Sequence, residues 1–385
     1  MSRFSWRTAG ESHGPTLIGV VEGVPSGLAL DPERVDRELA RRQRGYGRGG
    51  RMKIESDRVE LLSGLKGGVT IGAPIAFAVR NADHTLEKLA VPESPRPGHA
   101  DLAGCQKHGH RDPRAVLERA SARETAARVA AAGIARQVIE SLGVEVFAHL
   151  VEIGGVAAAP GAFEAAGERR AALREASALL CLDVAVEAEM KAAVDAAKAD
   201  GDTLGGVFEV RARGLPPGLG GYAAAGERLT GRIGGALFSI PAIKAVEFGL
   251  GFEVARRRGS SVHDPIDLAP GARGPGGWGR FARRSNNAGG LEGGMTTGEE
   301  LVVRAAMKPI PTLRRSLPTV AFQSGRPVPS TWQRSDVTSV PAASVVGEAM
   351  VALELVRAVL AKFGGDSMAQ LERAWEGYRS DLDRV

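Results

Sequence analysis

The order of strand-like and helix-like segments is the feature that most restricts how this chain can fold. Short apolar runs typical of strands occur at 16–21, 59–62, 75–79, 206–213, 245–248 and 301–307. Helical patterns occur at 32–42, 114–142, 184–199, 229–238 and 342–362. The two kinds alternate irregularly, without the sustained strand–helix–strand spacing of a doubly wound sheet. We therefore expect an α+β fold of packed layers, in one domain because no long linker is present.

Local signals sharpen this expectation. Asp31 followed by Pro32 predicts a helix start, since aspartate caps the first turn and proline suits its first position. Residues 114–142 are rich in alanine, arginine, glutamate and leucine and contain no proline, which predicts one long helix. Residues 256–285 are polar, basic and glycine-rich, so we expect a long surface loop. We expect residues 366–385 to form a charged peripheral tail after a catalytic domain at 1–365.

Composition restricts the class of protein. Glycine accounts for 51 of 385 residues, against about 7% in typical proteins, and its short clusters predict many tight turns. The two cysteines form no CxxC pair, so we expect neither a disulfide framework nor a metal site. No apolar run reaches the roughly 18 residues of a membrane span, and the N-terminus lacks a signal-peptide pattern. We expect a cytoplasmic protein with no membrane contact.

The distribution of arginine indicates the kind of ligand. The formal net charge is +5, and arginines concentrate at 41–51 and 111–128, mixed with glycine and serine. Only 5% of the residues are aromatic, so platforms for stacking single-stranded nucleic acid are scarce. Arginine forks match phosphates and carboxylates. We therefore expect a pocket for a small polyanion and no nucleic-acid partner.

Two histidines lie in segments that suit proton transfer. His13 lies in the glycine-flanked loop GESHG (10–14), and His99 lies in the turn RPGHAD (96–101), two residues before Asp101. Histidine titrates near neutral pH, so each side chain is a candidate acid or base. For His13 the alternative interpretation is a solvated surface turn. For His99 the signal of a catalytic pair is diluted, because His108 and His110 lie close by in the sequence.

Two further segments suggest anion binding. Arg119 and Arg123 are four residues apart and would share one helix face. Their like charges would repel unless an anion lies between them or Glu118 and Glu124 offset them. Residues 286–298 (NNAGGLEGGMTTG) could cradle a phosphate or a flat ring by backbone N–H groups. That segment lacks the GxGxxG and P-loop order, which excludes the common nucleotide motifs.

Taken together and in order, nine segments resemble the chorismate synthase family. They run from residue 10 to residue 336, nearly the whole chain. The segments are GESHG (10–14), RRQRGYGRGGRM (41–52), RPGHAD (96–101), RASARETAARVAA (119–131), GLPPGLG (214–220), SIPAIKAVEFGLGF (239–252), NNAGGLEGG (286–294), KPIPT (308–312) and RSD (334–336).

The resemblance implies a single-domain β-α-β sandwich with helices between antiparallel sheets, assembled as a homotetramer. It implies a carbon–oxygen lyase of the shikimate pathway, which serves aromatic amino acid biosynthesis. The implied reaction is the anti-1,4-elimination of phosphate from 5-enolpyruvylshikimate 3-phosphate, giving chorismate, with reduced FMN and no net redox change. Since we see no reductase domain, we expect an external NAD(P)H-dependent flavin reductase to supply the reduced FMN.

The resemblance also implies roles for residues that match the family's motifs. His13 matches the histidine that delivers a proton to the leaving phosphate, and His99 the histidine that protonates the reduced flavin. Asp336 matches an aspartate that helps the flavin N5 accept the substrate's C6 proton. The implied FMN contacts are Arg119, Ala120, Ser121, Pro241, Ala242, Gly293, Lys308, Pro309, Ile310, Pro311, Thr312 and Arg334. The residues matched to the substrate or to the NADP phosphate are Arg42, Arg48, Arg51 and Arg128.

The chain departs from the family pattern in two places. Arg334-Ser335-Asp336 stands where Arg-His-Asp is usual, which puts any contact of that histidine in doubt. Lys107-His108 stands where Lys-Tyr is usual. Two other functions stay open. A different flavin or phosphosugar lyase could use the same polyanion pocket without added reductant. A basic nucleic-acid-binding protein could use the arginines of 41–51 and 256–285, with steep salt dependence.

Overall fold

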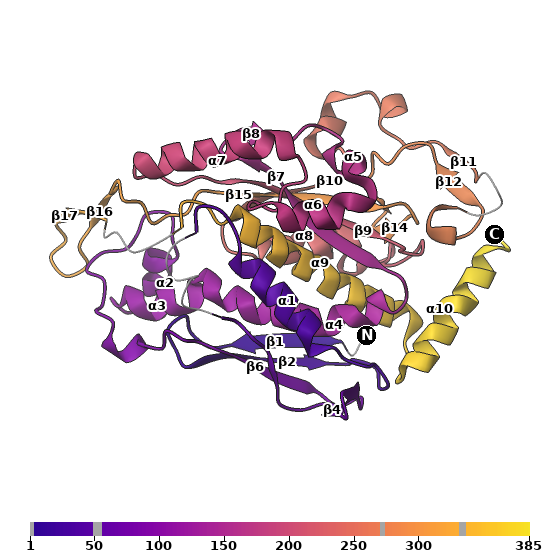
Figure 1. Ribbon diagram of the computed structural model, residues 1–385, viewed down its shortest axis with the longest axis horizontal. Coiled ribbons are helices and arrows are strands. Elements are labelled where there is room, and N and C mark those ends of the chain that lie inside the picture. The colour runs from indigo at the N-terminus through magenta and orange to yellow at the C-terminus, as the bar shows by residue number, and fades with distance from the viewer. Residues whose placement is uncertain (1–3, 49–55, 270–273, 331–335) are drawn as a thin grey trace.

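Helices lie between two antiparallel sheets in the computed structural model, which describes residues 4–48, 56–269, 274–330 and 336–385 (Figure 1). The first sheet has the strand order β1-β2-β6-β3 and the second the order β10-β15-β9-β7-β8. The expected α+β sandwich is therefore confirmed. The strands are β1 (Ser5–Ala9), β2 (Thr16–Glu22), β3 (Glu60–Leu61), β6 (Ile75–Arg80), β7 (Glu145–Ile153), β8 (Val156–Ala157), β9 (Gly206–Arg213), β10 (Ile243–Phe248) and β15 (Leu301–Met307).

One face of the first sheet covers the helices. In β2 the side chains of Leu17 and Val21 are buried while Ile18 is exposed, the alternation of a strand with one covered face. Gly19 lies on the buried face. A Cβ there would come within 2.3 Å of the Phe77 ring on β6, so the pairing of β2 with β6 requires glycine at this position.

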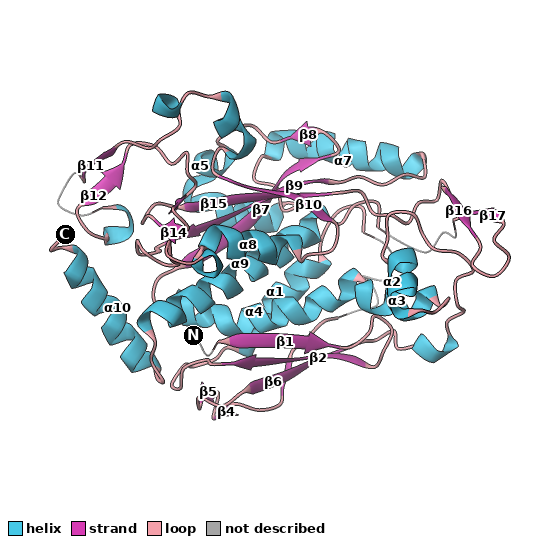
Figure 2. Ribbon diagram, turned by 180° about the vertical axis from the view of Figure 1, so that it is seen from behind, coloured by secondary structure: helices cyan, strands magenta, loops and turns pink. Residues whose placement is uncertain are grey.

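The layer between the sheets is formed by helices that include α9 (Val340–Phe363), the longest helix of the described residues (Figure 2). α4 packs against β2 of the first sheet, α9 packs against β7 and β9 of the second, and α4 and α9 pack on each other. Because α9 has neighbours on almost every side, it is buried along most of its length, which accounts for its apolar sequence. The helices of this layer are α1 (Pro32–Gln43), α4 (Thr125–Glu140), α8 (Leu229–Phe238) and α9 (Val340–Phe363).

Several predicted elements are confirmed. β9, β15, α8 and α7 (Val184–Ala199) have the bounds expected from the sequence. α1 begins as predicted, since the Asp31 carboxylate accepts a hydrogen bond of 2.9 Å from the Glu33 N–H and Pro32 takes the first helical position.

The single helix predicted at 114–142 is wrong. The chain forms α3 (Pro113–Ala120), a 3₁₀ turn and then α4. Ser121 is extended, and its hydroxyl accepts from the Arg123 N–H at 3.3 Å, so a serine that caps a new turn interrupts the helix. The break separates the two arginines expected on one face. Arg123 is buried against Asp57 at 2.7 Å, whereas Arg119 is exposed.

The long surface loop predicted at 256–285 is confirmed only in part. The segment is mostly exposed, but it contains the hairpin β11 (Ile266–Leu268) and β12 (Phe281–Arg283). Trp278 anchors it, since the indole is buried and its N–H donates to the Gly214 carbonyl at 3.3 Å. A buried aromatic ring in a polar, glycine-rich segment carries no periodic signal in the sequence.

The segment expected as a charged tail forms helix α10 (Met368–Leu382). Ser367 and Gln370 form a capping box at its start. Trp375 is buried on its inner face and contacts Trp278 and Phe363 edge-on, with ring centroids 5.1 and 5.2 Å away. Glu372, Arg373 and Glu376 of α10 are exposed, whereas Arg379 lies over the Trp278 ring, so residues 366–385 combine a solvated surface with a buried anchor.

The remaining elements are short helices and strands outside these layers and at their edges (Figure 1). In the described part of the chain, no helix is long and apolar enough to cross a membrane. The remaining helices and strands are α2 (Asp101–His108), α5 (Ala162–Ala166), α6 (Arg170–Ala176), β4 (Leu65–Lys66), β5 (Val69–Thr70), β13 (Leu291–Glu292), β14 (Met295–Thr296), β16 (Pro318–Val320) and β17 (Pro327–Pro329).

Candidate active site

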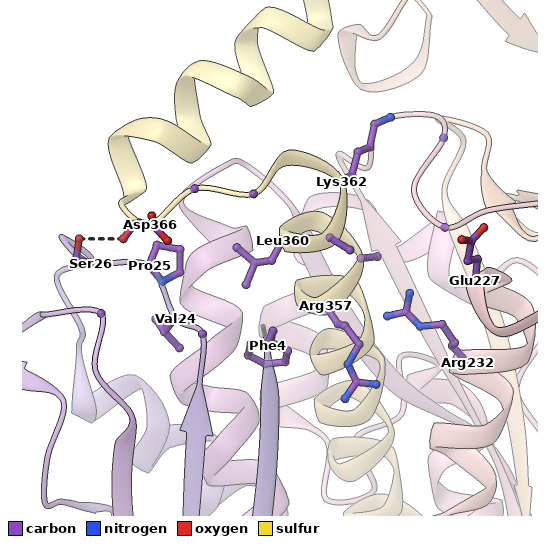
Figure 3. Close-up of a pocket in the computed structure, with 18 of the residues that line it drawn as sticks. Phe4, Val24, Pro25, Ser26, Glu227, Arg232, Arg357, Leu360, Lys362 and Asp366 are labelled. Carbon is purple, nitrogen blue, oxygen red and sulfur yellow. Dashed lines mark hydrogen bonds between the residues drawn. The ribbon is translucent and has the colours of Figure 1, made fainter. Parts of the chain in front are cut away.

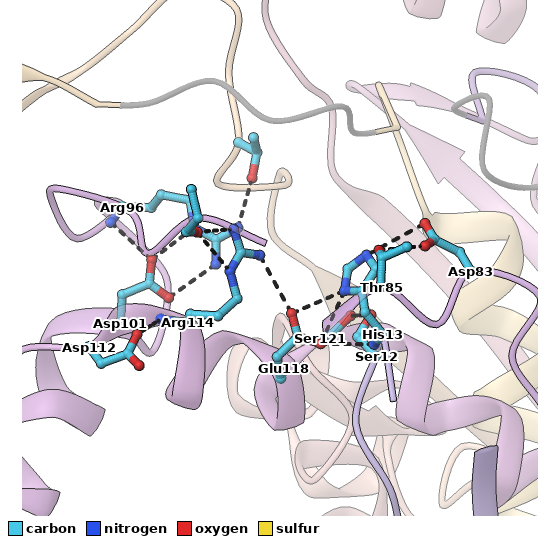
Figure 4. A network of polar contacts seen from close by, with 12 residues as sticks. Ser12, His13, Asp83, Thr85, Arg96, Asp101, Asp112, Arg114, Glu118 and Ser121 are labelled. Carbon is cyan, nitrogen blue, oxygen red and sulfur yellow. Dashed lines mark hydrogen bonds and ion pairs between the residues drawn. The ribbon is translucent and has the colours of Figure 1, made fainter. Parts of the chain in front are cut away.

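His13 lies in the loop between β1 and β2, and helix α3 holds it in place (Figure 4). Its backbone N–H donates to the Glu118 carboxylate at 2.8 Å, and its ring Nδ1 lies 3.0 Å from both oxygens of the same carboxylate. The preceding Ser12 N–H donates to the Glu118 carbonyl at 3.0 Å. The loop is therefore fixed to the last turn of α3 by three contacts with one residue.

The Glu118 carboxyl is ionised in this setting. Burial raises its pKa, but hydrogen bonds from the side chain and backbone of His13, helped by Arg114, outweigh burial and hold the pKa below its usual value. Arg114 Nη1 lies 3.5 Å from the carboxylate. On the other side of the His13 ring, Asp83 Oδ2 lies 3.9 Å from Nε2.

His99 has a similar partner from its own turn. Its Nδ1 lies 2.5 Å from Oδ1 of Asp101, whose side chain is 1% exposed. Arg96 donates to the same carboxylate from Nε at 2.8 Å, from Nη2 at 3.0 Å and from its backbone N–H at 3.1 Å. Burial opposes ionisation of Asp101, but the hydrogen bonds from His99 and Arg96 hold its pKa well below the usual range.

The His99 turn packs on the segment 308–312. Lys308 Nζ donates to the Gly98 carbonyl, 210 residues away in sequence, and Arg96 Nη1 lies 3.3 Å from the Thr312 hydroxyl. Gly98 has a left-handed φ of 78°, and a Cβ there would lie 3.2 Å from Lys308 Nζ. A side chain at this position would thus be strained and would crowd the lysine.

The matched segment 241–242 joins this group. The Lys308 backbone N–H donates to the Ala242 carbonyl at 3.0 Å. Ala242 has a φ of 70°, an uncommon conformation for a residue with a Cβ, and such outliers concentrate where the chain is held for function. Burial, followed by the charge of Lys244, lowers the pKa of Lys308. Lys308, which is partly desolvated, therefore lies beside both the His99 turn and the matched segment 241–242.

The matched residues 119–121 lie against the His13 loop instead. Arg119 donates to the Gly10 carbonyl at 2.9 Å and to the Thr8 carbonyl at 3.0 Å. The Ser121 hydroxyl bonds to the Ser12 hydroxyl at 3.1 Å. Ala120 ends α3 between them. Gly293 lies apart from these contacts in sequence, in the turn from β13 to β14, next to the start of α8.

Asp336 pairs with Arg48, since Arg48 Nη1 lies 3.1 Å from its Oδ2. The Ser339 hydroxyl donates to the same oxygen at 2.8 Å. Arg334, matched to FMN, and Arg51, matched to the substrate or to the NADP phosphate, lie outside the described residues. The structure therefore brings two candidate residues together, Arg48 from the arginine-rich segment and Asp336 from just before α9.

Other arginines of the predicted polyanion site are engaged inside the protein. Arg41 is buried and donates to Glu348 at 2.7 Å. Arg42 is buried among Asp57, Thr125 and Ala122, and burial lowers its pKa to about 10 although Asp57 opposes this. Arg128 pairs with Glu124 at 2.7 Å and donates to the Ser239 hydroxyl at 2.8 Å. The ligand roles of Arg42 and Arg128 stay predictions.

The segment 286–298 uses several of its N–H groups internally. The Asp264 carboxylate accepts from the N–H groups of Asn287 and Ala288 at 2.8 and 2.9 Å, and the Gly290 N–H donates to the Asn286 side chain at 2.7 Å. These donors hold the segment's own fold. Only the remaining N–H groups are left for the cradle expected from the sequence.

A cavity of about 1410 Å³ lies elsewhere, between the first sheet and the C-terminal part of α9 (Figure 3). It is lined by Phe4, Val24, Arg232, Arg357 and Leu360 among others. Arg232 and Arg357 both donate to Glu354, at 3.0 and 2.7 Å. The lining contains none of the residues matched to the active site. We therefore place the candidate chemistry at the histidines, where paired acids and bases lie, and not at this cavity.

Sequence reasoning missed Glu118 as the partner of His13, having considered it only as a counter-charge for Arg119. No spacing could have identified it, because the two residues are 105 positions apart. The pair of His99 and Asp101 was visible as a local motif.

Across the described ranges, no group of three or more His, Cys, Asp or Glu side chains is placed to hold a metal ion.

Comparisons with known proteins agree with one another. The family model for chorismate synthase matches residues 4–360. The chain is 51% identical to the chorismate synthase of Trichlorobacter lovleyi over 97% of this chain and 98% of that protein. It is 52% identical to that of Desulforudis audaxviator, covering 98% and 97%. A crystal structure of a chorismate synthase superimposes with a TM-score of 0.81 and 40% identity over the full length of both chains.

Proposed function

The chain belongs to the chorismate synthase family, and from this membership we propose that it eliminates phosphate from 5-enolpyruvylshikimate 3-phosphate to give chorismate. The observation that carries the proposal is the match of the family over residues 4–360, together with about 50% identity to curated relatives along almost the whole chain. The enzyme is accordingly a carbon–oxygen lyase of aromatic amino acid biosynthesis, and neither a different phosphosugar lyase nor a nucleic-acid-binding protein has comparable support.

We propose FMN as the cofactor, held by Arg119 to Ser121, Pro241 and Ala242, Gly293, Lys308 to Thr312, and Arg334. The chemistry of these groups fits an anionic, flat molecule: a partly desolvated lysine and an exposed arginine suit the phosphate, and the proline-rich segment 309–311 suits a ring. When bound and reduced, the flavin would supply an electron that is recovered before the cycle ends. An external NAD(P)H-dependent reductase, a homotetramer and a cytoplasmic location complete the proposal.

The proposed roles of the side chains follow from their contacts. His13 would deliver a proton from Nε2 to the leaving phosphate, since its Nδ1 is engaged with Glu118. His99 would hold a proton toward the flavin, since Asp101 occupies its Nδ1 in the same way. Asp336 would assist transfer of the substrate's C6 proton. Arg48, with Arg42, Arg51 and Arg128 as the further matched cations, would stabilise the negative charge that develops on the phosphate.

The test is an anaerobic assay with chemically reduced FMN and 5-enolpyruvylshikimate 3-phosphate. We expect equal amounts of chorismate and phosphate, with no net consumption of reduced FMN. Phosphate release that needs no reductant would contradict the proposal in favour of another lyase. Salt-sensitive DNA binding together with no flavin difference spectrum would contradict it in favour of a nucleic-acid-binding protein.

A further inference from the structure

We propose that Glu118 is the positioning residue of His13, fixing the tautomer of the imidazole and the direction in which it offers a proton. The inference rests on the proposed function, because it assumes that His13 is the acid at the leaving phosphate. It adds a residue outside the matched motifs, since Glu118 immediately precedes the segment 119–131.

Glu118 clamps His13 at two points, the backbone N–H and the ring Nδ1. One carboxylate accepts from the His13 backbone N–H at 2.8 Å and contacts Nδ1 at 3.0 Å. A carboxylate only accepts, so the hydrogen of this contact is on Nδ1. In the neutral ring Nε2 is then the acceptor, and in the cationic ring Nε2–H is the remaining donor. Proton exchange with a ligand is thereby restricted to Nε2.

Glu118 itself occupies an unfavourable position for a charged side chain. Its side chain is 2% exposed, and it lies in the last turn of α3, where the negative end of the helix dipole disfavours a carboxylate. A buried anion at this place requires compensation, which comes from His13 and from Arg114 one turn earlier. A residue needed only for packing would satisfy this position without a charge.

Other charged side chains also surround the His13 ring. The loop 81–85 approaches from the opposite side and holds Asp83 with Oδ2 3.9 Å from Nε2. The loop is tied to the His13 segment because the Leu86 N–H donates to the His13 carbonyl at 3.1 Å. The charged and titratable groups on the elements packed against His13 are Glu118, Arg114 and Arg119 from α3, Asp83 and His84 from the 81–85 loop, and Glu11 from its own loop.

The two carboxylates beside the His13 ring therefore have different roles. Glu118 is buried and holds the inner nitrogen, while Asp83 is one-third exposed and faces the outer nitrogen. The leaving phosphate would displace the weak contact with Asp83 and leave the clamp by Glu118 intact. The positioning role therefore predicts an effect on the turnover step rather than on binding of FMN or substrate.

The decisive experiment is a double-mutant cycle with Glu118→Gln and His13→Gln in the full-length enzyme, assayed with reduced FMN. Glutamine keeps the shape of Glu118 and removes its charge. We expect Glu118→Gln alone to lower kcat about 100-fold, the low end for a positioned acid, with KM for substrate and the Kd for oxidised FMN within threefold of wild type. In the His13→Gln background, the same change should lower kcat less than threefold.

The outcomes separate the two proposals. If His13→Gln is inactive but Glu118→Gln turns over normally, or if the two effects multiply, the positioning role is wrong and the proposed function stands. If wild type forms no chorismate, the proposed function fails. Should Glu118→Gln not fold, nitrogen NMR of wild type labelled at its histidines decides. We expect His13, identified by the signal missing in His13→Gln, in the Nδ1–H form when neutral. A neutral Nε2–H form would overturn the inference.

Discussion

The two candidate acids, His13 and His99, are each paired with a buried carboxylate, but the fold brings the two pairs together in different ways. His13 and His99 each present Nδ1 to a buried carboxylate, Glu118 and Asp101, which leaves Nε2 for chemistry. Asp101 lies two residues from its histidine in one turn. Glu118 is brought to His13 by helix α3, from 105 positions away. The pair of His99 and Asp101 is a local motif. The pair of His13 and Glu118 depends on how α3 packs against the loop between β1 and β2.

The carboxylates also differ in how firmly they are held. Arg96 donates to Asp101 three times within 3.1 Å, whereas Arg114 approaches Glu118 at 3.5 Å. The His99 turn is therefore rigid even without its histidine. The His13 loop and the end of α3 hold each other, so loss of either side would loosen both. The comparison can be tested by removing each part in turn.

Removing a histidine should have the largest effect. We expect His99→Ala to lower kcat by about 10²–10⁴-fold, the range for one acid or base, while oxidised FMN still binds, because the turn keeps its contacts through Arg96 and Asp101. His13→Ala should lower kcat by a similar factor. The measurement is the initial rate of chorismate formation, with the exposed His108→Ala as control. Turnover near the wild-type value would remove His99 from the mechanism.

Removing either carboxylate should lower the free energy of unfolding, and the two losses should differ. Asp101→Asn leaves Arg96 without its buried partner, and we expect the free energy of unfolding to fall by about 3 kcal/mol. Glu118→Gln should lower it by about half as much, since His13 and Arg114 are closer to solvent. Urea unfolding of both variants at pH 7 measures the difference. Equal losses would show that the two sites are held equally firmly.

The low pKa of Asp101 makes its contribution dependent on pH. A folded pKa below the unfolded value means that the stabilisation is present above the unfolded pKa, about 3.9, and is lost as pH falls below it. The stability difference between wild type and Asp101→Asn should thus shrink below about pH 4, by up to about 1.4 kcal/mol per pH unit. Unfolding curves from pH 5 to pH 2.5 would check this. A difference that stays constant would contradict the assigned ionisation.

The supporting arginines should show the smallest effects. We expect Arg96→Gln to lower the free energy of unfolding by about 1.5 kcal/mol, since it loses charged hydrogen bonds to a buried group. Arg114→Gln should lower it by about 0.5 kcal/mol, as for a single long ion pair. Denaturant unfolding of both variants tests the order, and a larger loss for Arg114→Gln would reverse the comparison.

The same contrast explains which parts of the fold could be predicted. Asp31 before Pro32 and the alternation in β9 and β15 are local patterns, and the elements they predict are present. Ser121 interrupts a helical composition because its hydroxyl caps a new turn, a competition that composition does not resolve. Trp278 and Trp375 order two segments expected as a loop and a tail, by a contact that joins residues far apart in sequence.

The contacts of the candidate site are likewise of two kinds, local ones that the sequence reveals and long-range ones that it does not. The turn RPGHAD contains both members of the His99 pair, so the sequence alone places them together. The contact of Lys308 with Gly98 spans 210 residues, and that of His13 with Glu118 spans 105. Neither follows from a period or a turn signal, because the sheets and helices between those residues set the distance. The family's motif order identified most of these segments, but not the contacts among them.

The central position of α9 has a consequence for how the protein is made. α9 fills the space between both sheets, yet it begins only at Val340. A ribosome that adds roughly 5–20 residues per second needs tens of seconds to reach it. During that time α9 is not there to cover the inner faces of β7 and β9. The apolar side chains that later pack on α9 therefore stay exposed on the nascent chain. Slow codons before residue 340 would lengthen this exposure, and chaperones that shield apolar surface would matter most in that interval.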